Sequence, residues 1–424
     1  MKKHISLGKS ILILMLAMIA VYQVSELWLV SLTNRNFFLY IEARFPAAVP
    51  DGQNAWVTPF RFFTGMGDGR FEVRYSEIGN SGEWIFGKFA ISRILAHGSF
   101  VEEVSPAVFF GLADGRPQLA FEYSFPMNGE TFARALGLRR GAFPSGSGIS
   151  TFTSITLLPP ASPSGEPLIC AFFWSGYTFL RFSLGLDTRR NPLEEFVFLV
   201  PDVNEGSIIF TRSAYGFFPT IPEGFVYSGV NVMNPFQNAF GLLHLSTIRP
   251  RIEHFFDNPA TIIPGPSRDV YSFSNINIVV RYLLFDVLEY TSFRPIGRTA
   301  PANLVSDFSA ALAFVNSDPY VINEVYLAGY EIRGGDHVFR FGYVVNGFPL
   351  VLYGGWHTMP DCREPLLAPI EVTVSHGRVI RYRRLAHTFG TGAVGTVSES
   401  GVDDYREVAF VFAPLGEVRF MGLR

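Results

Sequence analysis

The stretch HVFRFGYVVNGFPLVLY, from His337 to Tyr353, reads as two amphipathic strands that meet at the dipeptide Asn346-Gly347. Both residues of such a pair readily adopt positive φ, which the tightest hairpin turns require. The segment before it ends at Gly334-Gly335, and the segment after it, APIEVTVSHGRVIRYRRLAH, turns at His376-Gly377. These turns predict an antiparallel β meander.

A helix and a second hairpin flank this meander. The segment ANLVSDFSAALAFVNSD places Leu304, Phe308 and Ala311 at largely helical spacing. The segments REVAFVFAP and EVRFMGLR read as a hairpin around Leu415-Gly416. One helix packed on an antiparallel sheet forms an α+β layer, so residues 300–424 are predicted to form a C-terminal domain of this kind.

Two further extracytoplasmic segments are predicted upstream, a domain over residues 33–165 and a middle domain over 166–299. In the first, strands flank a turn at residues 65–69, and helices are expected over GEWIFGKFAISRILAHG and NGETFARALGL, the latter capped by Asn128 and ended by Gly137. In the second, LICAFFW, YTFLRFSLGL, EEFVFLV and INIVVRYLLFDVLEY read as strands, and MNPFQNAFGLLHL and IRPRIEHFFDNP as helices. The turn-forming stretch ASPSGEP separates the two domains.

Composition narrows the class of protein. The chain of 424 residues carries a net charge of −3, which does not favour a nucleic acid as partner. Its 43 Phe and 17 Tyr, with 40 Gly and 28 Pro, indicate a strand-rich body with many turns. Cys170 is expected in the core and Cys362 in a loop, and whether they pair stays open.

The N-terminus is predicted to anchor the chain in the membrane. Residues 1–9 hold three of the four lysines and are expected to stay in the cytoplasm. Residues Ser10 to Leu32 form a helix of roughly 34 Å if continuous, enough to cross a bilayer. The alternative is a signal peptide cleaved after Ala20, but Met18 is large for the −3 position of such a site. With an uncleaved anchor, the body lies outside the cytoplasmic membrane.

Polar residues interrupt the outer half of this apolar run. Tyr22, Gln23 and Glu26 share one face of the predicted helix. Glu26 lies close to the outer interface, where it can simply extend toward water. Alternatively, the three residues form a contact with a partner helix, because polar groups inside a membrane seek protein partners.

No specific constellation of catalytic residues is present in the sequence. There is no P-loop, no G-x-S-x-G and no H-E-x-x-H, and the eight histidines are scattered, so surface or capping roles are expected for them. The acid pairs Glu102-Glu103, Glu194-Glu195 and Asp403-Asp404 are compatible with a wall hydrolase, but adjacent acids usually mark a solvated face. We therefore predict no catalytic residues, no cofactor and no metal.

Aromatic runs leave a second alternative open. Such runs are most often core, but they can also line a groove for wall peptide or glycan. The runs are Phe109-Phe110, Phe172-Phe173-Trp174, Phe217-Phe218 and Phe255-Phe256.

Several segments carry a family resemblance. The sequences SELWLVSLTNRNFF, FEYSFPMNGETFARALG, RIEHFFDNPATIIPGPSRDVYSFSNINIVVRYLLFDVLEY and YVVNGFPLVLY…IEVTVSHGRVIRYRR resemble the YycH-type regulatory proteins of Firmicutes. The last region is also similar to the companion YycI family. The resemblance spans nearly the whole chain.

This resemblance implies a non-enzymatic regulator of the YycFG (WalRK) two-component system. Such proteins hold one N-terminal transmembrane helix and α+β domains outside the membrane. They associate with a YycI-like companion protein and with a YycG/WalK-like sensor histidine kinase that controls cell-wall metabolism. The family offers no agreed catalytic residues to transfer. An extracytoplasmic module that binds wall peptide or glycan is the alternative, and a wall hydrolase is the third reading.

Overall fold

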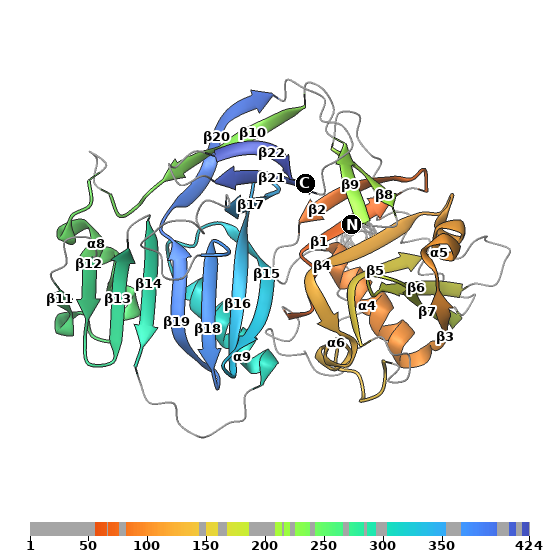
Figure 1. The fold of residues 1–424 in the computed structure, drawn as a ribbon, viewed down its shortest axis with the longest axis horizontal. Helices are drawn as coiled ribbons and strands as arrows, with labels where there is room; N and C mark the ends of the chain where they lie inside the picture. Colours follow the sequence, from red (N-terminus) through yellow and green to blue (C-terminus); the bar gives the residue numbers. More distant parts are fainter. Residues whose placement is uncertain are drawn as a thin grey trace, which may run out of the picture. The chain divides into compact units, whose positions relative to one another are not determined.

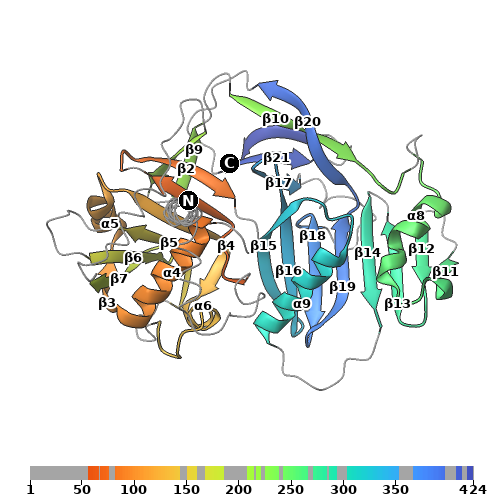
Figure 2. The same ribbon diagram turned by 180° about the vertical axis from the view of Figure 1, so that it is seen from behind.

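The structure is a computed structural model. It describes residues 56–65, 67–75, 82–143, 150–159, 168–185, 208–213, 216–220, 225–237, 242–265, 271–283, 286–293, 303–352, 366–396, 407–412 and 418–423. The helices and strands within these ranges fall into two large sheets, a two-stranded ribbon and the helices that pack on the sheets (Figures 1 and 2). The mixed α+β class agrees with the sequence prediction.

The first sheet has nine strands, and each neighbouring pair is antiparallel. Its order is β3-β7-β6-β5-β4-β1-β2-β8-β9. The strands are β1 (Arg61–Gly65), β2 (Arg70–Tyr75), β3 (Ser99–Val104), β4 (Gln118–Asn128), β5 (Thr151–Leu158), β6 (Leu168–Trp174), β7 (Phe179–Gly185), β8 (Ile209–Ser213) and β9 (Gly216–Thr220).

Helices cover both faces of the first sheet. Phe121 lies in register with Ile155, and Ile155 with Phe173, so the three side chains share one face. Helix α4 (Gly82–His97) packs on this face, where the Trp84 ring lies 5.4 Å from that of Phe121. Phe172 precedes Phe173 in β6 and therefore points to the opposite face, toward helix α5 (Pro106–Ala113).

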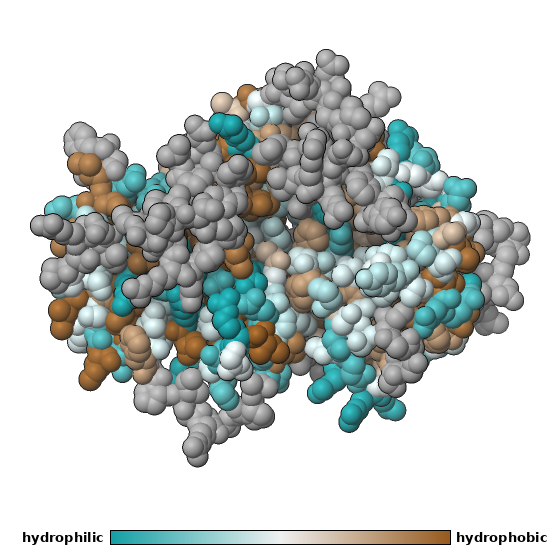
Figure 3. Space-filling view, in the orientation of Figure 1, coloured by the Kyte–Doolittle hydropathy of each residue, from teal (hydrophilic) through white to brown (hydrophobic). Residues whose placement is uncertain are grey.

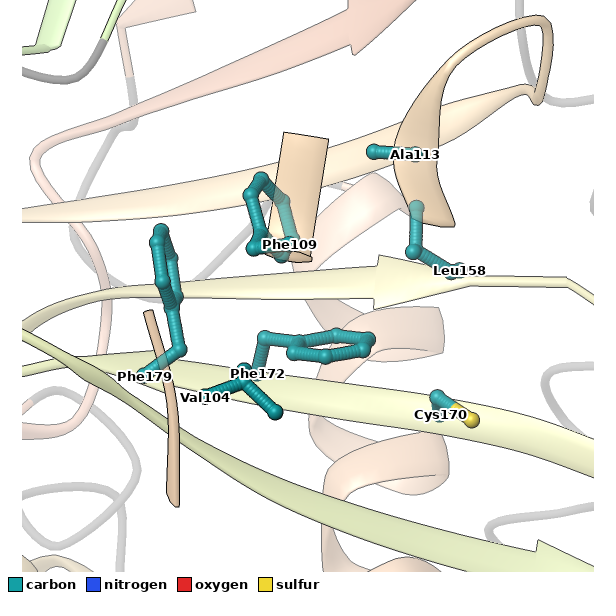
Figure 4. Close-up of a cluster of buried hydrophobic side chains, with 7 residues drawn as sticks. All are labelled: Val104, Phe109, Ala113, Leu158, Cys170, Phe172 and Phe179. Carbon is teal, nitrogen blue, oxygen red and sulfur yellow. The ribbon is translucent and has the colours of Figure 1, made fainter. Parts of the chain in front are cut away.

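The face below α5 is apolar. Seven buried residues form one cluster there, drawn in Figure 4, and the Phe109 and Phe179 rings stack at 4.1 Å within it. The cluster comprises Val104, Phe109, Ala113, Leu158, Cys170, Phe172 and Phe179. Cys170 is a buried free thiol, as the apolar run around it predicted, whereas Cys362 lies outside the described residues.

The second sheet has eleven strands and is mostly antiparallel, with β17 and β21 parallel. Its order is β11-β12-β13-β14-β19-β18-β16-β17-β21-β22, with β15 paired to β16. The strands are β11 (Ile263–Gly265), β12 (Tyr271–Ser274), β13 (Ile278–Leu283), β14 (Val287–Ser292), β15 (Glu324–Arg333), β16 (Asp336–Val345), β17 (Phe348–Leu352), β18 (Ile370–Ser375), β19 (Arg378–Leu385), β21 (Glu407–Phe412) and β22 (Val418–Leu423). The separate ribbon pairs β10 (Val226–Met233) with β20 (Thr388–Thr396).

Helix α9 (Leu304–Ser317) lies against one face of the second sheet (Figure 2). Its Phe308 ring is 5.4 Å from Phe339 of β16, and its Phe314 ring is 5.1 Å from Tyr382 of β19. Asn303 caps the helix by accepting a hydrogen bond from the Val305 amide. The helix predicted over this segment is confirmed.

The opposite face of the second sheet carries a row of alternating charges. Five charged residues lie in register across five neighbouring strands, in the order Arg281, Glu289, Arg383, Glu371 and Arg340. Arg340 Nε donates to Glu371 Oε2 at 3.2 Å, and Arg383 Nη1 lies 3.6 Å from Glu371 Oε1. Opposite charges directly across a strand pair stabilise the register, so this row helps to align the sheet.

The predicted turns have the expected backbone. Asn346 and Gly347 have φ of 51° and 81°, and His376 and Gly377 have φ of 50° and 77°. The two hairpins therefore close with two successive residues in the left-handed region, as tight turns of this kind require. The short helix α6 (Gly129–Ala135) likewise begins at the predicted cap, where Asn128 Oδ1 accepts from the Thr131 amide.

The predictions for the middle region have mixed outcomes. The helix predicted over MNPFQNAFGLLHL is wrong in its described part, where Gln237 forms an isolated bridge with Leu243 and the helix begins only at Leu245. The helix expected over IRPRIEHFFDNP is present only in its first part, where α8 (Leu245–Ile252) leads into the 3-10 turn η2 (Glu253–Phe255). Phe256 is extended, and a second 3-10 turn, η3 (Pro259–Thr261), begins at the last residue of the segment. The strand predicted over EEFVFLV lies outside the described residues.

The sheets do not divide where the sequence suggests domain boundaries. β6 and β7 follow residue 165 but belong to the first sheet, and β11 to β14 precede residue 300 but belong to the second. No helix among the described residues is long and apolar enough to span a membrane. The predicted anchor, Ser10 to Leu32, lies outside those residues and stays a prediction.

Candidate functional site

The partner-helix face proposed from the sequence lies outside the described residues. It consists of Tyr22, Gln23 and Glu26, so that contact stays a prediction. The described residues instead bring together a buried polar centre at one end of the second sheet, where β19 leads into β20.

The first half of this centre is the ion pair of Arg384 and Asp318. Arg384 Nε donates to Asp318 Oδ2 at 2.6 Å, and both side chains are fully buried. Asp318 follows α9 directly, and its other oxygen accepts from the Tyr320 amide at 3.0 Å. The Tyr382 hydroxyl donates to Asp318 as well, at 3.0 Å. The two oxygens of Asp318 thus accept hydrogen bonds from three separate donors.

The second half is built around Asp286. Asn234 Nδ2 donates to Asp286 Oδ1 at 2.9 Å, the Tyr282 hydroxyl donates to the same oxygen, and His387 Nε2 lies 3.3 Å from Oδ2. Asp286 has φ of 58°, a conformation that few residues other than glycine adopt. Local hydrogen bonds of this density hold the residue in that conformation.

Burial sets the protonation states of the centre. Burial lowers the pKa of His254 and of His387, and the carboxylates of Asp318 and Asp286 oppose the effect only in part. Both imidazoles are therefore neutral at pH 7, so the 3.6 Å contact of His254 with Asp318 is not an ion pair at that pH. Burial, followed by the neighbouring carboxylate, raises the pKa of Tyr282 and of Tyr382.

This chemistry favours positioning over reaction. Tyrosines whose pKa is raised stay protonated and donate hydrogen bonds, which is the opposite of an activated nucleophile. The contacts join four segments that are distant in sequence, namely the end of β10, the β13–β14 turn, the residues after α9 and the start of β20. Asn323 adds to them by donating to the Phe389 carbonyl at 2.7 Å. The centre thus fixes the base of the β10–β20 ribbon to the second sheet.

A second buried pair fixes the other end of α9. His337 Nδ1 lies 2.6 Å from Asp307 Oδ2, and the Gly377 amide donates to Asp307 Oδ1 at 2.5 Å. Burial, with a smaller contribution from Asp307, raises the pKa of the nearby Tyr330 to about 12. The surface or capping role expected of the histidines is therefore wrong for His337 and His387, which are each 8% exposed. It is right for His244, whose side chain caps α8.

Of the three acid pairs, only Glu102-Glu103 lies within the described residues, and its two carboxylates do not converge. Glu102 lies opposite Arg181 and Glu103 opposite Leu180, so the two carboxylates point to opposite faces of β3. Glu102 accepts from Arg181 Nη1 at 2.9 Å. Glu194-Glu195 and Asp403-Asp404 lie outside the described residues. Within the described ranges, no group of three or more His, Cys, Asp or Glu side chains could hold a metal ion.

The aromatic runs that suggested a binding groove belong largely to the core. At least one member of each run is buried, as expected of core residues. The buried members are Phe109, Phe172, Phe173, Phe217, Phe255 and Phe256.

Sequence reasoning missed the polar centre because its partners are far apart in the chain. Arg384 and Asp318 are separated by 66 positions, and nothing local marks Asp318. One signal was available in the sequence RYRRLAH. If this segment is a strand, its arginines point to both faces of the sheet. At least one of them must then face the buried side and need a buried acid.

Comparisons with known proteins give one structural neighbour. No family model matches the chain, and no curated protein matches it. The structure is similar to the crystal structure of YycH from Bacillus subtilis, with a TM-score of 0.45 and 11% sequence identity. The similarity covers 87% of this chain and 93% of that chain.

Proposed function

We propose that this chain is a membrane-anchored, non-catalytic accessory regulator of a sensor histidine kinase that controls cell-wall metabolism. The observation that carries the proposal is the family resemblance of the sequence. Three of its four segments fall on framework elements, namely β4 with α6, α8 through β14, and β16 through β19. A resemblance placed on both sheets concerns the architecture of the body rather than one short motif.

In this proposal the anchor, Ser10 to Leu32, crosses the cytoplasmic membrane with the N-terminus inside, and the body is extracytoplasmic. Tyr22, Gln23 and Glu26 contact a helix of a YycG/WalK-like kinase or of a YycI-like companion protein. The two sheets offer further contacts outside the membrane. The polar centre supports a non-catalytic role, because its tyrosines stay protonated and donate hydrogen bonds that hold chain segments in place.

Site-specific photocrosslinking in membranes tests this function. A photoreactive residue at Gln23 or Glu26 should capture the kinase or the companion protein. Val24 is the matched control, because it projects from roughly the opposite side of the predicted helix. Equal yields at all three positions, or no captured helix at any, would contradict the proposal.

A genetic measurement complements the crosslink. Gln23→Leu combined with Glu26→Leu should weaken regulation of a kinase-dependent wall gene while the body stays folded. Limited proteolysis of the purified double variant reports on the body. An unchanged transcriptional output would count against the partner-helix contact.

A further inference from the structure

The outer strand β3 leaves one edge of the first sheet open. β3 stands first in the strand order and pairs only with β7 among the described strands. Its first five residues, Ser99 to Glu103, are all exposed. Phe100 pairs with Phe182 but Glu102 pairs with Arg181, so Val101 is the extra residue of a β-bulge. The unpaired backbone groups of such an edge can accept another strand.

Two other outer strands contain a proline, which hinders the addition of a further strand, whereas β3 contains none. β9 contains Pro219, and β11 has only three residues, one of which is Pro264. Proline cannot donate to a neighbouring strand, so it blocks strand addition. β3 has six residues and no proline. β3 therefore lacks the proline found in β9 and β11, and only its bulge and its glutamates restrict which strand can pair with it.

Apolar side chains border the open edge. Phe100 is 41% and Val101 44% exposed, and Val108 in α5, four residues after β3 ends, is 50% exposed. Tyr177 lies in the β6–β7 turn, next to Thr178, whose hydroxyl donates to the Val104 carbonyl. Helix α5 has no polar side chain, although only Phe109 and Ala113 of it are buried. Figure 3 shows hydrophobic residues at the surface over α5 and β3.

The charges along this edge are acidic. Glu102 is paired with Arg181, whereas no ion pair joins Glu103 to another described residue. A second copy of this chain is a poor occupant, since antiparallel pairing of two β3 strands brings four glutamates together. A membrane surface is also a poor occupant, because anionic headgroups repel the same carboxylates. Charge complementarity favours a basic protein segment.

We propose that β3 binds an extended segment of a partner protein as a tenth strand of the first sheet. The segment has a cationic side chain opposite Glu103 and, on the other face, an apolar side chain that covers Val108. Main-chain hydrogen bonds supply affinity in such strand addition, and alternate side chains supply specificity. The proposal goes beyond the proposed function, because it requires neither the kinase nor the anchor.

Peptide binding to the full-length protein in detergent micelles tests this proposal. The probe is a fluorescent seven-residue peptide that alternates valine with arginine, and its binding is followed by anisotropy. Hydrogen exchange on the same sample should show new protection at residues 99–104 upon binding. A peptide with N-methyl groups along one edge should not bind, because it cannot complete the ladder. Binding of the methylated peptide, no binding of the parent, or protection elsewhere would overturn the proposal.

Charge reversal gives the second arm of the test. Glu103→Arg should weaken the arginine peptide about tenfold, because it replaces attraction across the strand pair by repulsion. The same variant should gain affinity for a peptide with glutamate in place of arginine. Glu253→Arg, in the 3-10 turn η2 outside the first sheet, is the control for net charge and should change neither affinity. Equal effects of the two substitutions would mean that binding follows net charge, and would overturn the assignment to β3.

Discussion

The two sheets are stabilised by different chemistry. The first sheet relies on phenylalanine clusters, in which Phe63 stacks on Phe217 at 3.7 Å and Phe109 on Phe179 at 4.1 Å. The second sheet adds directional polar contacts, notably the fully buried pair of Arg384 and Asp318. Apolar packing tolerates small shifts but not changes of volume, whereas a buried ion pair tolerates neither loss of a partner nor a change of protonation. Mutation and pH should therefore separate the two sheets.

The largest effect is expected at the buried ion pair. Asp318→Ala leaves the Arg384 guanidinium buried without its carboxylate, and should lower the free energy of unfolding by about 3–5 kcal/mol. Urea denaturation measures the loss, and hydrogen exchange should place it in the second sheet. A loss shared equally by both sheets would remove the distinction drawn between them.

A change of volume should act on the first sheet instead. A Cβ at position 87 would lie 2.0 Å from the Phe121 ring, so Gly87→Ala should cost about 1–3 kcal/mol through overpacking. Gly111 in α5 has open space around its Cβ position, and Gly111→Ala should stabilise the protein by about 0.5–1 kcal/mol. Thermal unfolding of the two variants compares them directly. If both substitutions raised the unfolding temperature, helix propensity rather than packing would decide the effect at position 87.

Acid should weaken the second sheet first. Burial holds the pKa of His387 below its ordinary value, with Asp286 opposing in part, so the folded state binds this proton less readily than the unfolded chain. Stability is then complete above the unfolded pKa, about 6.5, and is lost as the pH falls through that value toward the folded pKa. His254 adds to the same trend.

The variant His387→Gln isolates this contribution. It should flatten the dependence of the urea midpoint on pH between about 7.5 and 5.5. Protection factors in the first sheet, which correct the exchange rates for their intrinsic pH dependence, should change little over the same range and serve as the internal control. A slope identical to that of the parent protein would assign the acid sensitivity to other groups.

The smallest effect is expected at an exposed pair of the same chemistry. Glu102 and Arg181 approach to 2.9 Å, but the Glu102 side chain is 50% exposed. A double-mutant cycle with Glu102→Gln and Arg181→Gln should give a coupling of about 1 kcal/mol or less. A coupling as large as the loss at Asp318 would mean that burial does not control the strength of these pairs.

Much of the local structure could be predicted from the sequence. Asn346-Gly347 and His376-Gly377 mark hairpins because their backbone preferences act within a few residues. The spacing of Phe308 and Ala311 marks α9 for a similar reason, since the period of a helix is local. The middle region was harder, because the short apolar runs there are compatible with either a helix or a strand.

The sequence by itself determined the turns, most helices, the hydrophobic runs that form the core and the family resemblance. Only the tertiary structure decided which strands share a sheet, and it alone paired Arg384 with Asp318 and His387 with Asp286. It also placed β3 at an outer edge of the first sheet, with no further strand beside it among the described residues. Turn and helix preferences are properties of neighbouring residues, whereas the pairing of distant charges depends on where burial removes water, which only the assembled fold defines.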